Sequence, residues 1–248
     1  MNLLPLNSLD DPATPFTVHA AANRDVTQLV LLHLEEPDRI VCAWHEHYFG
    51  ASGSESTKKI WTGIVKAVDT GADTDESLQY EVTPSRVEDL NGAQGRPALA
   101  PLADGGYLVA WEHRDENEAT SRVRWTRFGQ SGAKISTAAY LTSSNPGSQA
   151  IPGMGVSSQA EVFLLWLADQ GGEAADFVGR LGTVPAEVGT AEIGAILFSE
   201  TVVGTGAVGA ESFPVVKGMY DGRFAMVWQS DASQIVLRFA RLQGAETP

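Results

Sequence analysis

The chain has 248 residues, of which 31 are acidic and 17 basic, so its formal net charge is −14. This balance argues against nucleic acid and anionic membrane surfaces as partners, because both are bound through Lys and Arg. No stretch approaches 18 consecutive apolar residues, so no membrane-spanning helix is expected. The only cysteine, Cys42, lies in an apolar run and is expected to be a small buried thiol.

Four short apolar segments recur in the same order along the chain, each bounded by Gly, Asn, Asp or Ser. Such segments predict strands, and 25 glycines would destabilise helices. We expect a single domain over residues 1–248, built from four copies at approximately 14–70, 79–134, 138–186 and 196–245. The strands expected in chain order are 15–19, 27–33, 39–44 and 61–64; 79–83, 96–102, 106–111 and 125–128; 138–142, 150–156, 161–166 and 178–181; 197–201, 212–217, 223–228 and 239–242.

The third strand of each copy ends on a tryptophan that follows an apolar run. These strands are apolar on both faces, which is typical of strands covered on both sides. A β-propeller provides that cover, because each sheet packs between two neighbours. We therefore predict an all-β, propeller-like fold, closed within one chain or by pairing with a second copy. The packing residues expected are Trp44, Trp111, Trp166 and Trp228.

Glycines mark the turns that lead into two of the tryptophan strands. Asp104-Gly105-Gly106 and Asp221-Gly222 predict tight hairpin turns, because glycine tolerates the positive φ that these turns need. A second glycine pattern, Gly204 to Gly209, matches a dinucleotide-binding fingerprint. It runs into a strand rather than a helix, so no cofactor is expected.

The second copy contains a pattern made by Pro97, Leu102, Asp104, Gly105, Gly106, Tyr107, Val109, Trp111, Arg127, Phe128 and Gly132. This pattern resembles a tandem repeat of large secreted bacterial proteins of the RTX type. The fourth copy is similar at Pro214, Asp221, Gly222, Phe224, Val227, Trp228 and Arg241. The resemblance implies a surface or adhesive context and carries no catalytic residues. The calcium-binding nonapeptide of those proteins is absent.

The loops after the tryptophans are expected to emerge on one face, where equivalent loops of a propeller gather. The first two loops hold the densest mixture of aromatic, histidine, acidic and arginine residues, which are typical of recognition sites. The candidate ligand-binding residues are His45, His47, Tyr48, Phe49, Glu112, His113 and Arg114, with Trp61 and Trp125 as a possible sugar-stacking pair. His45 and His47 share a strand face, but no third ligand completes a zinc site, so no metal is predicted.

These patterns favour a non-enzymatic binding or assembly module with a protein or glycan partner on the loop face, such as an adhesin or a virion appendage. The alternative is a carbohydrate-active hydrolase, because the acids Glu46, Glu112, Asp169 and Asp231 follow the four tryptophans. The first ten residues do not form a secretory signal peptide. An extracellular or virion-associated location is expected, and a cytoplasmic one stays open.

Overall fold

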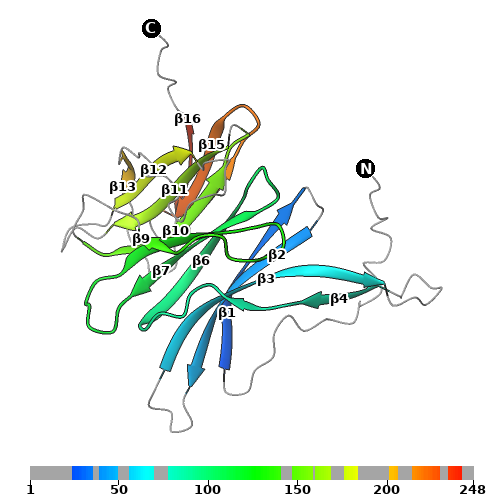
Figure 1. Cartoon of the computed structure of the whole chain (residues 1–248). Helices are drawn as coiled ribbons and strands as arrows, with labels where there is room; N and C mark the ends of the chain where they lie inside the picture. Colours follow the sequence, from blue (N-terminus) through cyan, green and yellow to red (C-terminus); the bar gives the residue numbers. More distant parts are fainter. Residues whose placement is uncertain are drawn as a thin grey trace.

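The computed structural model describes residues 24–35, 39–49, 56–69, 78–140, 147–158, 160–168, 176–183, 201–205, 214–229 and 234–241. The regular structure in these ranges is β-strand, arranged in four antiparallel sheets that follow one another along the chain (Figure 1). The predicted all-β, propeller-like fold is therefore confirmed. The same ranges contain no helix long and apolar enough to cross a membrane.

Each sheet contains one tryptophan strand, flanked by the strands that precede and follow it in the chain. Sheet A consists of β1 (Arg24–Leu34), β2 (Arg39–Phe49), β3 (Ser56–Asp69), β4 (Leu78–Val82) and β5 (Ser85–Arg86). Sheet B consists of β6 (Ala93–Pro101), β7 (Tyr107–Arg114), β8 (Arg122–Phe128) and β9 (Ala139–Tyr140). Sheet C consists of β10 (Gln149–Val156), β11 (Glu161–Ala168), β12 (Asp176–Thr183) and β13 (Thr201–Thr205), and sheet D of β14 (Val215–Gly218), β15 (Arg223–Gln229) and β16 (Ile235–Arg241).

The sheets are offset by one strand from the copies expected from the sequence. β4 was expected to open the second copy, but it pairs with β3 of sheet A. In the same way, β9 pairs with β8 and β13 pairs with β12. Each of the first three sheets thus takes its last strand from the segment that was assigned to the following copy. The first expected strand, 15–19, lies outside the described residues.

A β-bulge interrupts the first strand of sheets A, B and C at the same place. The register shifts between Thr27 and Val30, between Gly95 and Ala98, and between Ala150 and Gly153. Gln28, Arg96 and Ile151 have φ values of 54°, 54° and 52° at these shifts. Pro97 and Pro152 directly follow two of these residues. Proline has no backbone N–H to donate to the neighbouring strand, and at a bulge no such hydrogen bond is needed.

The core consists of three apolar clusters, one between each pair of successive sheets. Trp111 belongs to the cluster between sheets A and B, Trp166 to that between B and C, and Trp228 to that between C and D. Trp44 is also fully buried. The predicted packing between sheets is confirmed for Trp111, Trp166 and Trp228. Cys42 is buried as expected, and burial raises its pKa to about 11.

Candidate functional site

Two adjoining cavities lie at the end of sheet A where β2 leads into β3. The first, of about 230 Å³, is lined by Glu46, Tyr48, Thr57, Lys59, Trp61 and Arg86. The second, of about 290 Å³, shares Thr57 and Lys59 and continues to the start of sheet B, where it is lined by Asn91, Gly92, Ala93, Arg114, Asp115, Glu116 and Glu118. Together they form one depression, which we call the rim cleft. It lies on the predicted loop face.

An aromatic wall of the rim cleft is made by Trp61 on β3. Trp61 lies opposite Trp44 on the neighbouring strand β2. Trp44 is buried, whereas Trp61 is half-buried. On its other side Trp61 pairs with Arg86 of β5, whose guanidinium carbon lies 5.3 Å from the ring centroid. Arg86 is held in turn by Asp89, at 2.5 Å. The wall therefore combines an apolar ring with a fixed hydrogen-bond donor.

The floor of the rim cleft next to Trp61 is acidic. Glu46 follows Trp44 by two residues on β2, so strand alternation puts both side chains on the same side of the sheet. Its carboxylate is buried, and it pairs in register with Lys59 of β3. Lys59 donates a hydrogen bond to the carbonyl of Leu90, and burial lowers the pKa of its amine. Groups of both charges therefore line the first cavity.

A second carboxylate, that of Asp115, is fixed by two neighbours in the other part of the cleft. His113 Nε2 lies 2.9 Å from one of its oxygens, and the hydroxyl of Tyr140 donates to the other at 2.9 Å. The hydrogen bond from His113 holds the pKa of Asp115 below its usual range. Burial raises the pKa of Tyr140. The centroid of its ring lies 4.2 Å from the guanidinium carbon of Arg124. Asp115 is therefore ionised and oriented at neutral pH.

Other acids of this rim are bound to arginines. Glu118 forms an ion pair with Arg122 at 2.6 Å. Glu112 accepts hydrogen bonds from Arg96 at 2.9 Å and from Ser121 at 2.8 Å. These carboxylates fix the local structure. Glu116, which is exposed in the cleft, and Glu46 complete the acids that line it.

The structure brings three predicted site residues, Tyr48, Trp61 and Arg114, to the rim cleft. His113 orients Asp115 of the cleft, and Glu112 is bound to Arg96 and Ser121. His45 is buried and lies 3.3 Å from Thr27 Oγ1, and its ring stacks on that of His47, with 6.4 Å between the centroids. The side chain of Phe49 lies outside the described part. Among the described residues, no three His, Cys, Asp or Glu side chains are placed to hold a metal ion.

The expected pairing of Trp61 with Trp125 is wrong. Trp61 lies opposite Trp44, whereas Trp125 lies opposite Ala110, one position before Trp111. A shift of one residue moves a side chain to the other face of a strand. Trp125 is consequently buried in the cluster between sheets B and C, with 7% of its surface exposed.

Lys59 and Arg86 line the cleft and were not expected from the sequence. Arg86 reaches Trp61 only because β5 pairs with β3, and nothing in the residues 85–86 predicts that pairing. Lys59 stands beside Lys58 at the start of a strand, where a charged pair is ordinarily solvated.

No family model matches the chain, and no curated protein matches it in sequence. Solved structures do resemble it. A protein of unknown function from Dyadobacter fermentans has a TM-score of 0.60 at 12% identity, over 90% of this chain and 67% of that one. An endo-arabinase from Bacteroides thetaiotaomicron has a TM-score of 0.51 at 10% identity, over 86% of this chain and 74% of that one.

A third similar structure is the α-L-arabinanase of Penicillium chrysogenum complexed with arabinobiose. It has a TM-score of 0.50 at 13% identity, over 88% of this chain and 62% of that one. At these identities the likeness concerns the fold alone. The chain shares the β-propeller fold of these proteins.

Proposed function

We propose that this protein acts on carbohydrate and that its glycan lies in the rim cleft. The observation that carries the proposal is the arrangement of Trp61, Arg86 and Glu46 around one cavity. A flat aromatic ring suits the apolar face of a sugar, and the charged groups beside it suit the hydroxyls at the sugar's edge. Tyr48, which is 38% exposed, adds a second aromatic surface.

The specific reaction we propose is hydrolysis of a glycosidic bond, which requires two carboxylates across the sugar. Glu46 in one part of the cleft and Asp115 in the other are the candidates. Asp115 is ionised, as a nucleophile must be, since its pKa is lowered by His113. The arabinan-cleaving enzymes among the similar structures support this choice over other reactions on carbohydrate.

Binding without turnover is the second candidate, and one observation favours it. Both oxygens of Asp115 accept hydrogen bonds from protein groups, and Glu118 is paired with Arg122. Carboxylates held in this way are suited to positioning a ligand and poorly suited to exchanging a proton with it. A glycan-binding module would use the same cleft without cleaving its ligand.

Both candidates are tested with a panel of oligosaccharides that includes arabinobiose, measuring binding by calorimetry and turnover by release of reducing ends. We expect at least one ligand to bind, and Trp61→Ala to weaken that binding by about tenfold or more, as loss of a central aromatic contact does. Glu46→Gln should abolish turnover and retain binding if the protein is a hydrolase.

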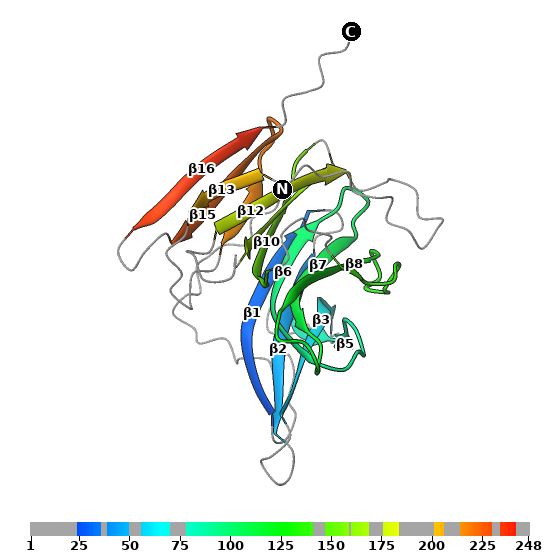
Figure 2. The same ribbon diagram turned by 90° about the vertical axis from the view of Figure 1, so that its left-hand side faces the viewer.

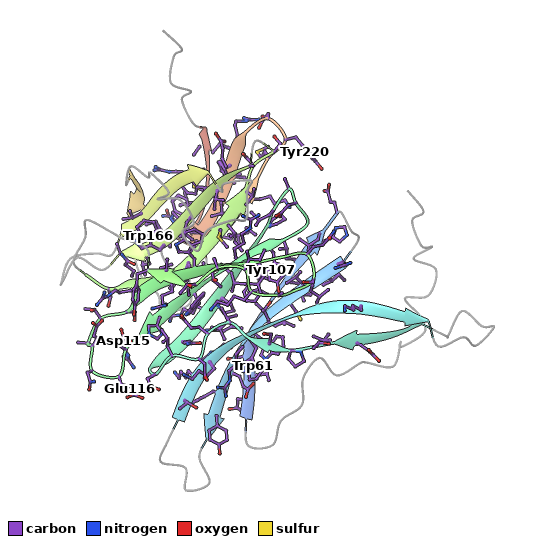
Figure 3. All side chains as sticks on the ribbon, in the orientation of Figure 1. Trp61, Tyr107, Asp115, Glu116, Trp166 and Tyr220 are labelled. Atoms are coloured by element: carbon purple, nitrogen blue, oxygen red, sulfur yellow. The ribbon has the colours of Figure 1, made fainter. Side chains whose placement is uncertain are left out.

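The matched control is Tyr220→Ala, because Tyr220 is 89% exposed and lies at the opposite end of the molecule from Trp61 and Asp115 (Figure 3). This variant should bind as the wild type does. Binding without turnover selects the second candidate. If the panel contains no ligand, or if Trp61→Ala binds with full affinity, the proposed site is wrong.

A further inference from the structure

The rim cleft consists of two cavities of similar size, about 230 Å³ and about 290 Å³. Sites that bind small molecules ordinarily measure roughly 300–1,000 Å³. Each cavity alone is smaller than this range, whereas the two cavities together fall within it. A ligand that fills the rim cleft therefore extends through both cavities.

The two cavities differ in the chemistry of their walls. The first contains the aromatic side chains of Tyr48 and Trp61. None of the described residues that line the second is aromatic, and its walls are made by a tight turn at Gly92, whose φ is 94°, and by charged side chains. These charged residues are Lys59, Arg114, Asp115, Glu116 and Glu118. A sugar ring can thus stack in the first cavity, and in the second it is held at its edge through its hydroxyls.

Thr57 and Lys59 are common to both cavities. They stand two positions apart on β3, so both side chains point to the same face of the sheet. The amine of Lys59 donates a hydrogen bond to the carbonyl of Leu90, which follows β5 beside β3 (Figure 2). An ammonium group carries three N–H donors, and Leu90 is the acceptor that the described residues provide. The other donors are available to a ligand at the border of the two cavities.

Acidic neighbours favour the charged form of Lys59. Burial lowers the pKa of its amine, and the carboxylates of Asp89, Glu116 and Glu88 oppose this fall. The oxygens around a glycosidic linkage are hydrogen-bond acceptors: the bridging oxygen, the ring oxygen and the neighbouring hydroxyls. A charged donor between the two cavities therefore suits the linkage between two sugar units, because charge-assisted hydrogen bonds are stronger than neutral ones.

We propose that the rim cleft binds two linked sugar units, one in each cavity, and that Lys59 contacts the linkage between them. One unit stacks on Trp61, the next lies against Arg114 and Asp115, and the amine of Lys59 donates to the oxygens between the two. The ligand is an oligosaccharide rather than a single sugar. This inference rests on the proposed carbohydrate function of the cleft, and it holds whether or not the ligand is cleaved.

The test compares one sugar unit with two linked units of the same sugar, in series of arabinose, xylose and glucose. Ligand-observed NMR measures the dissociation constants, since it also detects the weak binding of a single unit. We expect the wild type to bind two units about tenfold or more tightly than one in at least one series, as a hydrogen bond from a charged donor contributes. Lys59→Met should abolish most of this gain and leave the affinity for the single unit unchanged. Lys59→Arg, which keeps a charged donor, should retain the gain.

Lys58→Met is the matched control. Lys58 is exposed and adjoins Lys59 on the strand, so its side chain points to the other face of the sheet. This variant should bind both lengths as the wild type does. Arg114→Ala tests the second cavity independently of Lys59: it should weaken the binding of two units and not of one, whereas Trp61→Ala should weaken both.

Two results would overturn the inference while leaving the proposed function in place. One is equal affinity for one and two units in every series that binds, and the other is an equal loss of affinity for both lengths in Lys59→Met. Binding in none of the series would contradict the proposed function itself, and this inference would fall with it.

Discussion

At the scale of single residues, two buried glutamines connect successive sheets. Gln94 Oε1 accepts a hydrogen bond of 3.1 Å from the backbone amide of Ile60, and Gln149 Oε1 accepts one of 3.0 Å from that of Val123. Each glutamine stands three residues before a proline, at Pro97 and Pro152. The spacing is visible in the sequence, but the partner is not, because it belongs to the preceding sheet.

Gln94→Ala should lower the free energy of unfolding by about 1–3 kcal/mol, because it leaves the buried amide of Ile60 without an acceptor. Urea denaturation measures the change. Gln130→Ala is the control, since the side chain of Gln130 is exposed. This variant should unfold at the same urea concentration as the wild type. Equal urea midpoints for the wild type, Gln94→Ala and Gln130→Ala would show that the hydrogen bond between Gln94 and Ile60 does not stabilise the protein.

His45 predicts a pH dependence of stability. Burial lowers its pKa from 6.5 to about 4, and the charges of Lys58, His47 and Arg96 add to this fall. The unfolded chain therefore binds more protons than the folded chain between these pH values. The free energy of unfolding should fall as the pH drops through this window, by up to about 2 kcal/mol at pH 5.

His45→Asn should flatten that part of the pH profile, and His33→Asn, at an exposed position, should leave it unchanged. Thermal unfolding at pH 7 and pH 5 provides the measurement. A slope that persists in His45→Asn would assign the effect to another group.

At the scale of elements, the strands and their turns follow from local sequence, and the pairing of the strands does not. The turn at Asp104 is as predicted: Gly105 has a φ of 76°, and the amide of Gly106 donates to Asp104 Oδ1 at 3.0 Å. Gly222 has the same φ in sheet D. Turn chemistry is readable because it depends on residues close together in the chain.

The pairing partners required information that a single sequence lacks. β4, β9 and β13 have the composition of strands, but either neighbouring sheet could have taken them. The offset of one residue between Trp61 and Trp125 likewise depends on how β3 and β8 align with their tryptophan strands. For this reason the loop face and Tyr48, Trp61 and Arg114 were found from the sequence, while Lys59 and Arg86 were not.

Gly106 tests the packing of the hairpin in sheet B. A Cβ added there would lie 2.5 Å from the carbonyl oxygen of Phe128, which is backbone and cannot rotate away. Gly106→Ala should therefore destabilise the protein by about 1–3 kcal/mol. At Gly95 the nearest atom would be 4.0 Å away, so Gly95→Ala is the matched control and should change stability by about 0.5 kcal/mol or less. A smaller loss in Gly106→Ala than in Gly95→Ala would contradict the description of this turn.

At the scale of the whole molecule, the row of sheets gathers the loops of sheets A and B at one end. That arrangement makes one cleft from residues far apart in the sequence, such as Trp61 and Asp115. Both lie on the side of the molecule away from Tyr220 (Figure 3). The repeats could be predicted from the sequence because their pattern recurs four times. The cleft could not be predicted in the same way, because its residues come from sheets A and B alone.

The central claim is that carbohydrate binds in the rim cleft. The most direct measurement is a crystal structure of the protein soaked with the best ligand of the oligosaccharide panel. The account predicts a sugar ring against Trp61, within hydrogen-bonding distance of Arg86 or Glu46. A sugar bound elsewhere on the molecule, with the rim cleft empty, would contradict it.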